Sequence, residues 1–225
     1  MNKMDFISQL EAAFNQNKNE ENAFQMKKYM KDLFSYYGIK TTERRAIFHD
    51  LLKLYKQEIS ENYREIALTL FKKEYRELHY CGIEILIKNL KKNYRKDDIK
   101  LIETFLITNS WWDSVDTISK YLLGQYLIEF PNETEKVIER FSNSNNMWLN
   151  RSAIIFQLGY KKNTNYELLF SECLKHSQSK EFFIQKAIGW ALREYGSVNP
   201  GLVLNFVNNT NLKPLSRKEA IRKLI

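Results

Sequence analysis

The chain contains few of the residues that interrupt helices. Its 225 residues include only 7 glycines and 3 prolines. Because glycine and proline are the strongest local breakers of helix, their scarcity, together with abundant Leu, Ile, Lys and Glu, predicts an all-α protein. The length suffices to bury a substantial core. No long flexible linker separates the helical segments, so we expect a single domain over residues 1–225.

Cysteine and histidine are also scarce. The two cysteines, Cys81 and Cys173, lie far apart and lack CxxC spacing, which indicates buried thiols rather than a disulfide framework or a zinc site. The three histidines form no metal-ligand motif with neighbouring cysteines or acids. We therefore expect neither a metal nor another cofactor.

Long apolar runs are missing as well. The N-terminus continues into an amphipathic segment, which argues against a signal peptide and against a membrane span. The expectation is a cytoplasmic, monomeric protein with no membrane partner.

The charge of the chain is unbalanced towards the basic side. Lys and Arg number 35 against 27 Asp and Glu, which gives a formal net charge of +8 and a pI near 9.2. This balance suits a polyanionic partner such as nucleic acid. Basicity alone does not identify that partner, because many soluble proteins carry a similar excess.

Apolar residues recur at helical spacing in segment after segment. Two early stripes are Phe6, Leu10, Ala13, Phe14 and Met26, Met30, Leu33, Phe34. Helix starts recur roughly every 16–20 residues, so a helix pair repeats about every 35–40 residues, the period of HEAT-like α-solenoids. Such solenoids bind partners on a concave face. No residue signature repeats from pair to pair, so a plain helical bundle is the alternative.

The run from Ser110 to Asp116, SWWDSVD, is hard to explain by packing alone. On a helix, Trp112 and Asp116 are at i and i+4 and therefore share one face. That face would offer an aromatic π surface beside a negative charge. Both groups attract a cation, so the pair is suited to holding a developing positive charge.

Purely structural readings of the same run are available. Ser110 and Asp113 fit a capping box at a helix start. Asp116 could pair with Lys120 one turn later. A large ring such as that of Trp111 is normally buried in a core.

Two later segments combine apolar helices with basic residues. Arg151 opens an apolar helix after Trp148, and it fits either an exposed helix charge or a guanidinium fork that grips a phosphate. Residues 180–195 form the most apolar segment of the chain. Core packing is the default explanation for Trp190, and Gly189 beside it leaves room for another backbone.

Taken together, these segments closely resemble the AlkD-like DNA alkylation repair family of HEAT-like-repeat DNA glycosylases. The WWDSVD and KEFFIQKAIGWALREY runs are too long to match by coincidence. The shared elements extend over nearly the whole length and comprise residues 26–31, Gly38-Ile39 with Arg44-Arg45, residues 110–116, Trp148-Leu149 with Arg151, residues 181–195, and residues 215–217 with Glu219-Ala220.

The resemblance implies a single curved α-solenoid that cradles duplex DNA and removes positively charged alkylated purines such as 3-methyladenine and 7-methylguanine. The catalytic acid of that family falls on Asp116, and the tryptophans that flank the lesion fall on Trp112 and Trp190. The expected DNA-binding residues are Arg151, Tyr29, Lys161, Arg45 and Lys186.

These residues permit a simple mechanism. An alkylated cationic purine leaves as a neutral base, so the remaining burden is the oxocarbenium-like sugar. Asp116 would stabilise that cation and orient the attacking water, while Trp112 and Trp190 contact the deoxyribose. The resemblance implies that no base-reading pocket is used. The alternatives are a non-catalytic helical scaffold that binds nucleic acid or protein, and a hydrolase that uses Asp113 and Asp116 as an acid/base pair.

Overall fold

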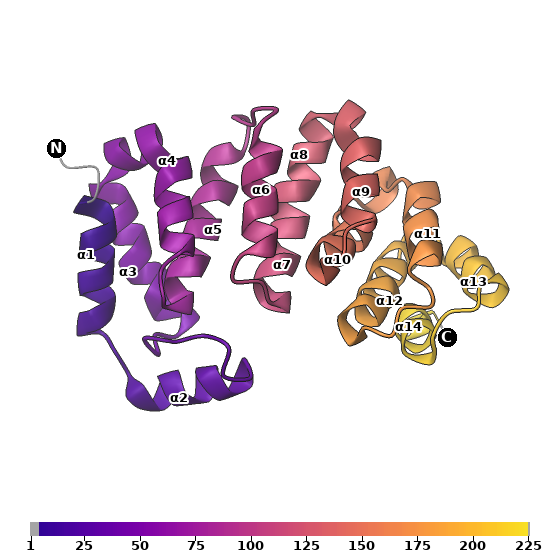
Figure 1. Ribbon diagram of the computed structural model, residues 1–225, viewed down its shortest axis with the longest axis horizontal. Coiled ribbons are helices and arrows are strands. Elements are labelled where there is room, and N and C mark those ends of the chain that lie inside the picture. Colours follow the sequence, from indigo (N-terminus) through magenta and orange to yellow (C-terminus); the bar gives the residue numbers. More distant parts are fainter. Residues whose placement is uncertain (1–4, 225) are drawn as a thin grey trace. The chain divides into compact units, whose positions relative to one another are not determined.

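The computed structural model describes residues 5–224; residues 1–4, which the prediction on a signal peptide concerned, and residue 225 lie outside the described part. Within residues 5–224 the regular elements are all helices, which confirms the all-α prediction (Figure 1). None of these helices combines the length and the apolar character needed to cross a membrane. By their contacts the helices divide into two compact units, Met1–Asn93 and Tyr94–Ile225. The single-domain organisation stays a prediction.

The first unit packs its helices around aromatic and aliphatic side chains. Helix α1 packs against α3 and α4, and α4 packs along α5. The predicted stripe on the first helix is largely confirmed, since Phe6, Leu10 and Phe14 are fully buried. The helices of this unit are α1 (Asp5–Gln16), α2 (Glu20–Tyr29), α3 (Thr41–Leu54), α4 (Lys56–Phe71) and α5 (Arg76–Leu90).

The second predicted stripe, from Met26 to Phe34, is wrong as a single helix. Helix α2 ends at Tyr29, and the backbone turns into the left-handed region at Lys31 (φ 58°) and Asp32 (φ 60°). None of the α2 side chains is buried. Asn22, Ala23 and Met26 are half-buried, so the helix makes only partial contact with the rest of the unit.

The loop that follows α2 is anchored by a buried carboxylate. Glu77 accepts hydrogen bonds from the backbone N–H groups of Tyr37 (3.2 Å), Gly38 (2.9 Å) and Ile39 (3.3 Å). Burial raises the pKa of Glu77 above its ordinary value, and these three hydrogen bonds oppose the rise. Gly38 has φ +85°, and a Cβ there would lie 2.0 Å from the carbonyl oxygen of Asn19.

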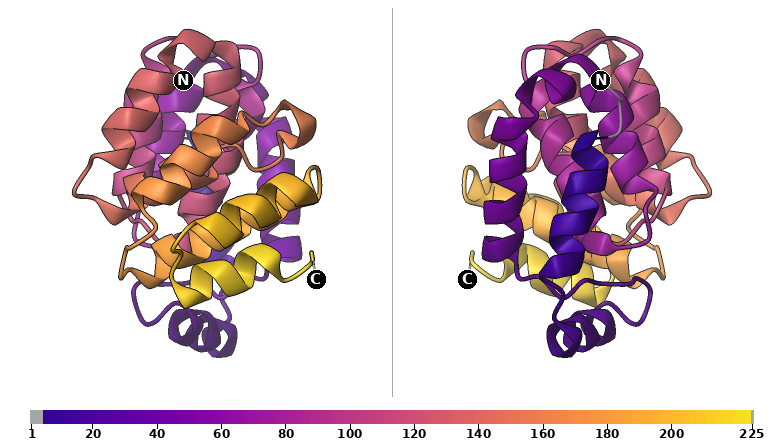
Figure 2. Two further views of the ribbon diagram at one scale, coloured as in Figure 1. Left: turned by 90° about the vertical axis from the view of Figure 1, so that its right-hand side faces the viewer. Right: turned by 90° about the vertical axis from the view of Figure 1, so that its left-hand side faces the viewer.

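The second unit contains the tryptophan-rich run. Helix α10 packs against α6, α9 and α12, and α12 packs along α14. At the C-terminal end α13 and α14 lie side by side (Figure 2, left). The helices are α6 (Asp98–Ile107), α7 (Trp112–Ile118), α8 (Gly124–Glu129), α9 (Thr134–Ser142), α10 (Met147–Ile155), α11 (Tyr166–Lys175), α12 (Phe182–Gly196), α13 (Pro200–Asn209) and α14 (Pro214–Ile221). A π-helical turn, Ser119–Leu123, joins α7 to α8, and short 3-10 turns occupy Pro131–Glu133 and Lys161–Asn163.

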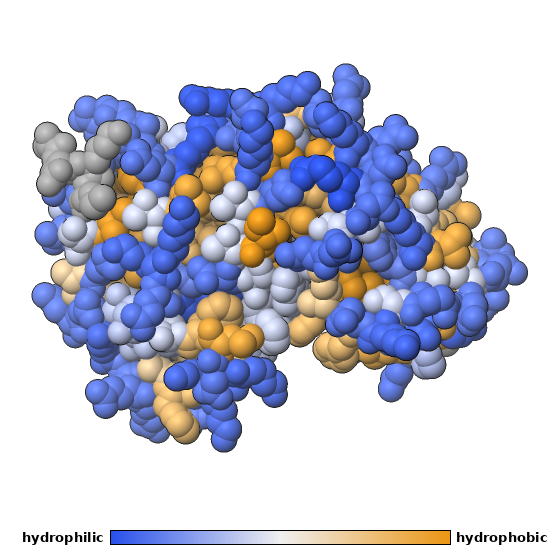
Figure 3. Space-filling view, viewed as in Figure 1, coloured by the Kyte–Doolittle hydropathy of each residue, from blue (hydrophilic) through white to orange (hydrophobic). Residues whose placement is uncertain are grey.

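The interior of each unit is mainly apolar, with a few buried charged groups such as Glu77 and Arg151, while the face seen in Figure 3 is largely hydrophilic with small apolar patches. In the second unit Ile155, Ile188, Leu192 and Val203 are fully buried in one cluster. Both cysteines are free and buried, as predicted.

Replacing Gly38 tests the loop architecture. Gly38→Ala should lower the free energy of unfolding by at least about 2 kcal/mol, because it strains a left-handed residue and collides with backbone. Urea unfolding followed by circular dichroism measures the change. Gly201→Ala is the matched control: its Cβ would meet nothing closer than 3.8 Å, so its stability should be equal or slightly higher. Equal losses in both variants would contradict the assignment.

Candidate active site

The WWDSVD run forms the start of helix α7, but it does not form the predicted capping box. The helix begins at Trp112, and Trp111 occupies the N-cap position with an extended backbone. Ser110 Oγ instead donates to the carbonyl of Leu106 at 2.6 Å, so Ser110 closes the preceding helix and does not cap α7. The capping-box reading is therefore wrong. Trp112 and Asp116 both lie on α7 one turn apart, which confirms the predicted helical spacing.

Asp116 forms a bidentate ion pair with Arg151 of α10. Arg151 Nε donates to Oδ1 at 2.7 Å, and Nη2 donates to Oδ2 at 2.8 Å. The Asp116 side chain is 15% exposed and the Arg151 side chain 5% exposed. The predicted partner Lys120 lies elsewhere, with its ammonium 5.2 Å from the centre of the Tyr121 ring. Asp116 is thus paired across the fold rather than along its own helix.

Arg151 also reaches a third helix. Its Nη1 donates to the carbonyl oxygen of Phe183 in the first turn of α12. One buried guanidinium therefore joins α7, α10 and α12. The reading of Arg151 as an exposed helix charge is wrong, whereas its contact with a DNA phosphate stays a prediction.

Burial and pairing act on the Asp116 carboxyl in opposite directions. Burial raises its pKa above the ordinary value of 3.8, while the hydrogen bonds and the charge of Arg151 oppose that rise. The neighbouring carboxylate of Asp113 adds to the increase. Arg151 therefore stabilises the ionised form of a carboxyl group that is only slightly open to solvent.

Small residues bring α10 close to the segment that follows Asp116. Ser119 Oγ donates to the carbonyl of Val115 at 2.7 Å and lies 2.8 Å from Ser152 Oγ, within hydrogen-bond distance. A Cβ on Gly124 would lie 2.5 Å from the carbonyl of Phe156. Ser119 opens the π-helical turn, a feature frequently found beside functional sites. These contacts fix the spacing between the helices that carry Asp116 and Arg151.

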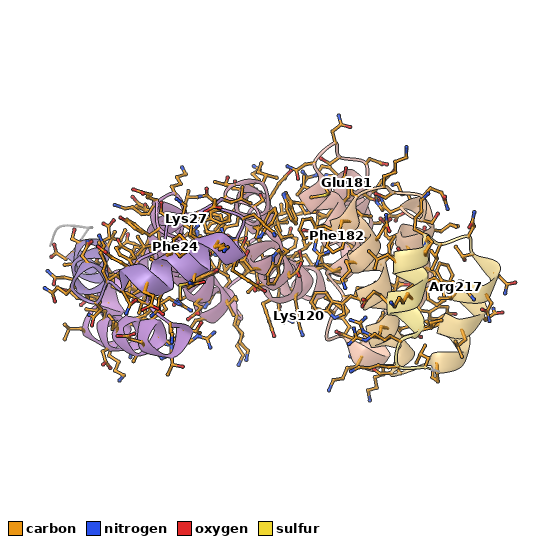
Figure 4. The ribbon with its side chains drawn as sticks, turned by 90° about the horizontal axis from the view of Figure 1, so that it is seen from below. Phe24, Lys27, Lys120, Glu181, Phe182 and Arg217 are labelled. Carbon is orange, nitrogen blue, oxygen red and sulfur yellow. The ribbon has the colours of Figure 1, made fainter. Side chains whose placement is uncertain are left out.

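An aromatic cluster lies beside the ion pair. Trp111 contacts Trp148 and Phe183, with ring centres 5.7 and 5.1 Å apart, and Trp148 lies 5.1 Å from Phe183. Phe182 adjoins this cluster at 5.4 Å and is 57% exposed at the start of α12 (Figure 4). Trp111 is half-buried in this cluster rather than in the main core. The sequence alone assigned no role to Trp148 and Phe183. The pattern that could have found them is a bulky aromatic residue in the first turn of an apolar helix that also carries a basic residue.

The two predicted lesion-contacting tryptophans lie on different helices. Trp112 opens α7, and Trp190 lies on α12, seven residues after Phe183. Both are half-buried. Trp190 packs against the core cluster of the second unit, so core packing accounts for part of its environment.

The other predicted DNA-binding residues are distributed over both units. In the second unit, Lys161 is exposed in a 3-10 turn, and Lys186 pairs with Glu219 at 2.9 Å. In the first unit, Tyr29 is 69% exposed at the end of α2, the helix that also carries Phe24 and Lys27, which are labelled in Figure 4. Arg45 is exposed and pairs with Glu84 at 3.1 Å. The structure therefore gives Lys186 and Arg45 protein partners, and their DNA contacts stay predictions.

Comparison with known proteins defines the class. Residues 10–224 match the family described as "DNA alkylation repair enzyme", and the chain belongs to that family. The chain is similar to the solved structure of a "Predicted DNA alkylation repair enzyme from Enterococcus faecalis", with 32% sequence identity and a TM-score of 0.84. The match covers 92% of this chain and 96% of that chain. No curated protein matches the sequence significantly.

A double-mutant cycle tests the ion pair. Arg151→Met should lower the free energy of unfolding by about 3 kcal/mol, because it leaves a mostly buried carboxylate without its cation. Adding Asp116→Asn should recover part of this loss, with a coupling energy of about 1–3 kcal/mol. Urea unfolding of the four proteins gives the coupling. Additive effects would show that the two side chains do not support each other in solution.

Proposed function

We propose that this protein is a DNA glycosylase that excises positively charged alkylated purines, such as 3-methyladenine and 7-methylguanine, from duplex DNA in base excision repair. Family membership supports action on DNA alkylation damage. The observation that carries the glycosylase reading is the Asp116 carboxylate, held by Arg151 and one turn from Trp112. It places a fixed negative charge beside an indole.

The chemistry of a cationic lesion needs little more than this arrangement. Cleavage of the glycosidic bond releases a neutral base and leaves positive charge on the sugar, so no acid has to protonate the leaving group. Asp116 stabilises the sugar cation and orients the attacking water, a preorganised electrostatic role. Trp112 and Trp190 contact the deoxyribose with their ring faces, which adds cation–π attraction.

Arg151 serves two functions in this proposal. In the free protein it maintains the ionised form of Asp116, whose pKa burial would otherwise raise further. Three of its donor atoms hold Asp116 and Phe183. A guanidinium has five N–H groups, so a phosphate oxygen would have to reach one of the other two on a side chain that is only 5% exposed. A phosphate bound there would share the positive charge of Arg151. The Asp116 carboxylate would then be less strongly neutralised and would attract the sugar cation more strongly.

The DNA interface belongs to the same proposal. A HEAT-like solenoid would hold the duplex in a concave groove, and the net charge of +8 would supply affinity through phosphate contacts. Recognition would depend on the charge and lability of the lesion rather than on hydrogen bonds to base edges. Bulky cationic adducts should therefore be tolerated.

Asp116→Asn tests the catalytic assignment. Single-turnover release of 7-methylguanine from a defined duplex should slow by on the order of 10²–10³-fold, the scale for losing one electrostatic stabiliser. Binding to undamaged duplex should persist. Asp113→Asn, the same change three residues earlier on α7, should excise at nearly the wild-type rate. Full activity of Asp116→Asn would exclude Asp116, and equal losses in both variants would favour an acid/base pair.

Lesion selectivity tests the proposed mechanism. With one carboxylate and no general acid, the wild-type protein should release 7-methylguanine and leave uracil and O6-methylguanine in place. Time courses on duplexes that each carry one defined lesion measure this difference. Comparable release of uracil and 7-methylguanine would contradict the leaving-group argument, and release of neither would favour a non-catalytic scaffold.

A further inference from the structure

A buried carboxylate on α14 holds two cations of α12. Glu219 accepts hydrogen bonds from Lys186 Nζ at 2.9 Å and from Arg193 Nη1 at 2.6 Å. Arg193 Nη1 also donates to the backbone carbonyl of Glu219 at 3.0 Å, so it grips both the side chain and the main chain. Arg222 lies further out, 3.9 Å from the same carboxylate.

These two cations lie on either side of Trp190 along one face of α12. Lys186, Trp190 and Arg193 occupy positions i, i+4 and i+7, which project from the same side of a helix. A carboxylate that holds the first and the third of them resists rotation of the helix about its axis. The direction in which Trp190 projects is then set from α14.

The backbone contact beneath these side chains supports this restraint. A Cβ on Gly189 would lie 2.4 Å from the Cβ of Glu219 and 3.0 Å from the carbonyl of Ser216, so the two helices meet at this glycine. Ser216 Oγ donates to the carbonyl of Gln185 at 3.1 Å. Glu219 therefore acts where the backbones of α12 and α14 approach closely.

The same carboxylate offsets positive charge on α12. The hydrogen bond from Lys186 lowers the pKa of Glu219 below its ordinary value, so the group stays ionised at neutral pH. The Lys186 side chain is 38% exposed. Removing the negative charge would leave Lys186 and Arg193 without their anion and make this surface more attractive to DNA phosphates.

We propose that Glu219 is a positioning residue for Trp190: through Lys186 and Arg193 it fixes the rotation of α12, at the cost of some DNA affinity. This inference rests on the proposed function for its kinetic consequence. It predicts an unusual combination, because loss of the carboxylate should slow excision while it tightens DNA binding. A residue that only stabilised the fold would not produce opposite changes.

Glu219→Gln is the variant that tests this combination, because it keeps volume and removes the charge. Excision of 7-methylguanine in single-turnover reactions should slow by roughly 10-fold, within the range for a misplaced catalytic contact. The Kd for undamaged duplex at low salt should fall by about 2–5-fold, since one local anion is lost. Glu219→Asp, which retains the charge but retracts it, should slow excision and leave the Kd unchanged.

Glu103→Gln is the matched control. Glu103 of α6 also accepts a hydrogen bond from an arginine, Arg140, at 2.6 Å, so the variant makes the same charge change at a different pair. Its excision rate should equal that of the wild-type protein. A Glu219→Gln rate equal to that of the Glu103→Gln control would overturn the proposal.

Fluorine NMR gives a readout that does not depend on activity. The chain has four tryptophans, so 5-fluorotryptophan labelling gives few resonances, and Trp190→Phe and Trp112→Phe variants assign two of them. Glu219→Gln and Glu219→Asp should shift or broaden the Trp190 resonance and leave that of Trp112 in place. An unmoved Trp190 resonance would overturn the proposal even if the protein excises no base. Absence of wild-type excision with a shifted Trp190 resonance would reject the proposed function alone.

Discussion

The site depends on one buried guanidinium. Arg151 holds the Asp116 carboxylate with two hydrogen bonds and the Phe183 carbonyl with a third, so three helices meet on a single side chain. A planar, permanently charged fork suits this task better than a lysine ammonium. Breaking such a pair by removing one partner is costly, because the remaining charge is left uncompensated. The contacts of Arg151 therefore determine both the packing of the three helices and the charge of the site.

Features governed by local spacing could be predicted from the sequence. The helical fold follows from scarce glycine and proline, and the placement of Trp112 and Asp116 one turn apart follows from the period of the helix. Pairings between distant residues could not be predicted: Arg151 lies 35 residues from Asp116, and Lys186 lies 33 residues from Glu219. Neither sequence separation belongs to a recognisable motif. The capping-box prediction was wrong because the Ser110 hydroxyl donates to a carbonyl of the preceding helix instead of capping α7. A sequence motif does not show which of these two hydrogen bonds a serine makes.

Three cations of the candidate site, Arg151, Lys186 and Arg193, are held by carboxylates. Asp116 neutralises Arg151, and Glu219 faces Lys186 and Arg193. The net basic charge of the chain therefore overstates the charge available near Trp190. A duplex approaching this unit would meet partly screened cations, whose contribution depends on how readily each carboxylate gives up its partner. Local pairing, as well as total charge, would then set affinity.

The two buried thiols have a practical consequence. Cys81 lies in the first unit, where burial raises its pKa to about 12, and Cys173 lies in the second, where burial also raises its pKa. Thiolate, the form that reacts with alkylating and disulfide reagents, is therefore nearly absent at both positions while each unit remains folded. Each unit therefore contains one natural thiol that becomes reactive when the unit opens. Rates of thiol labelling at the two positions would give the opening frequency of each unit separately, without any introduced probe.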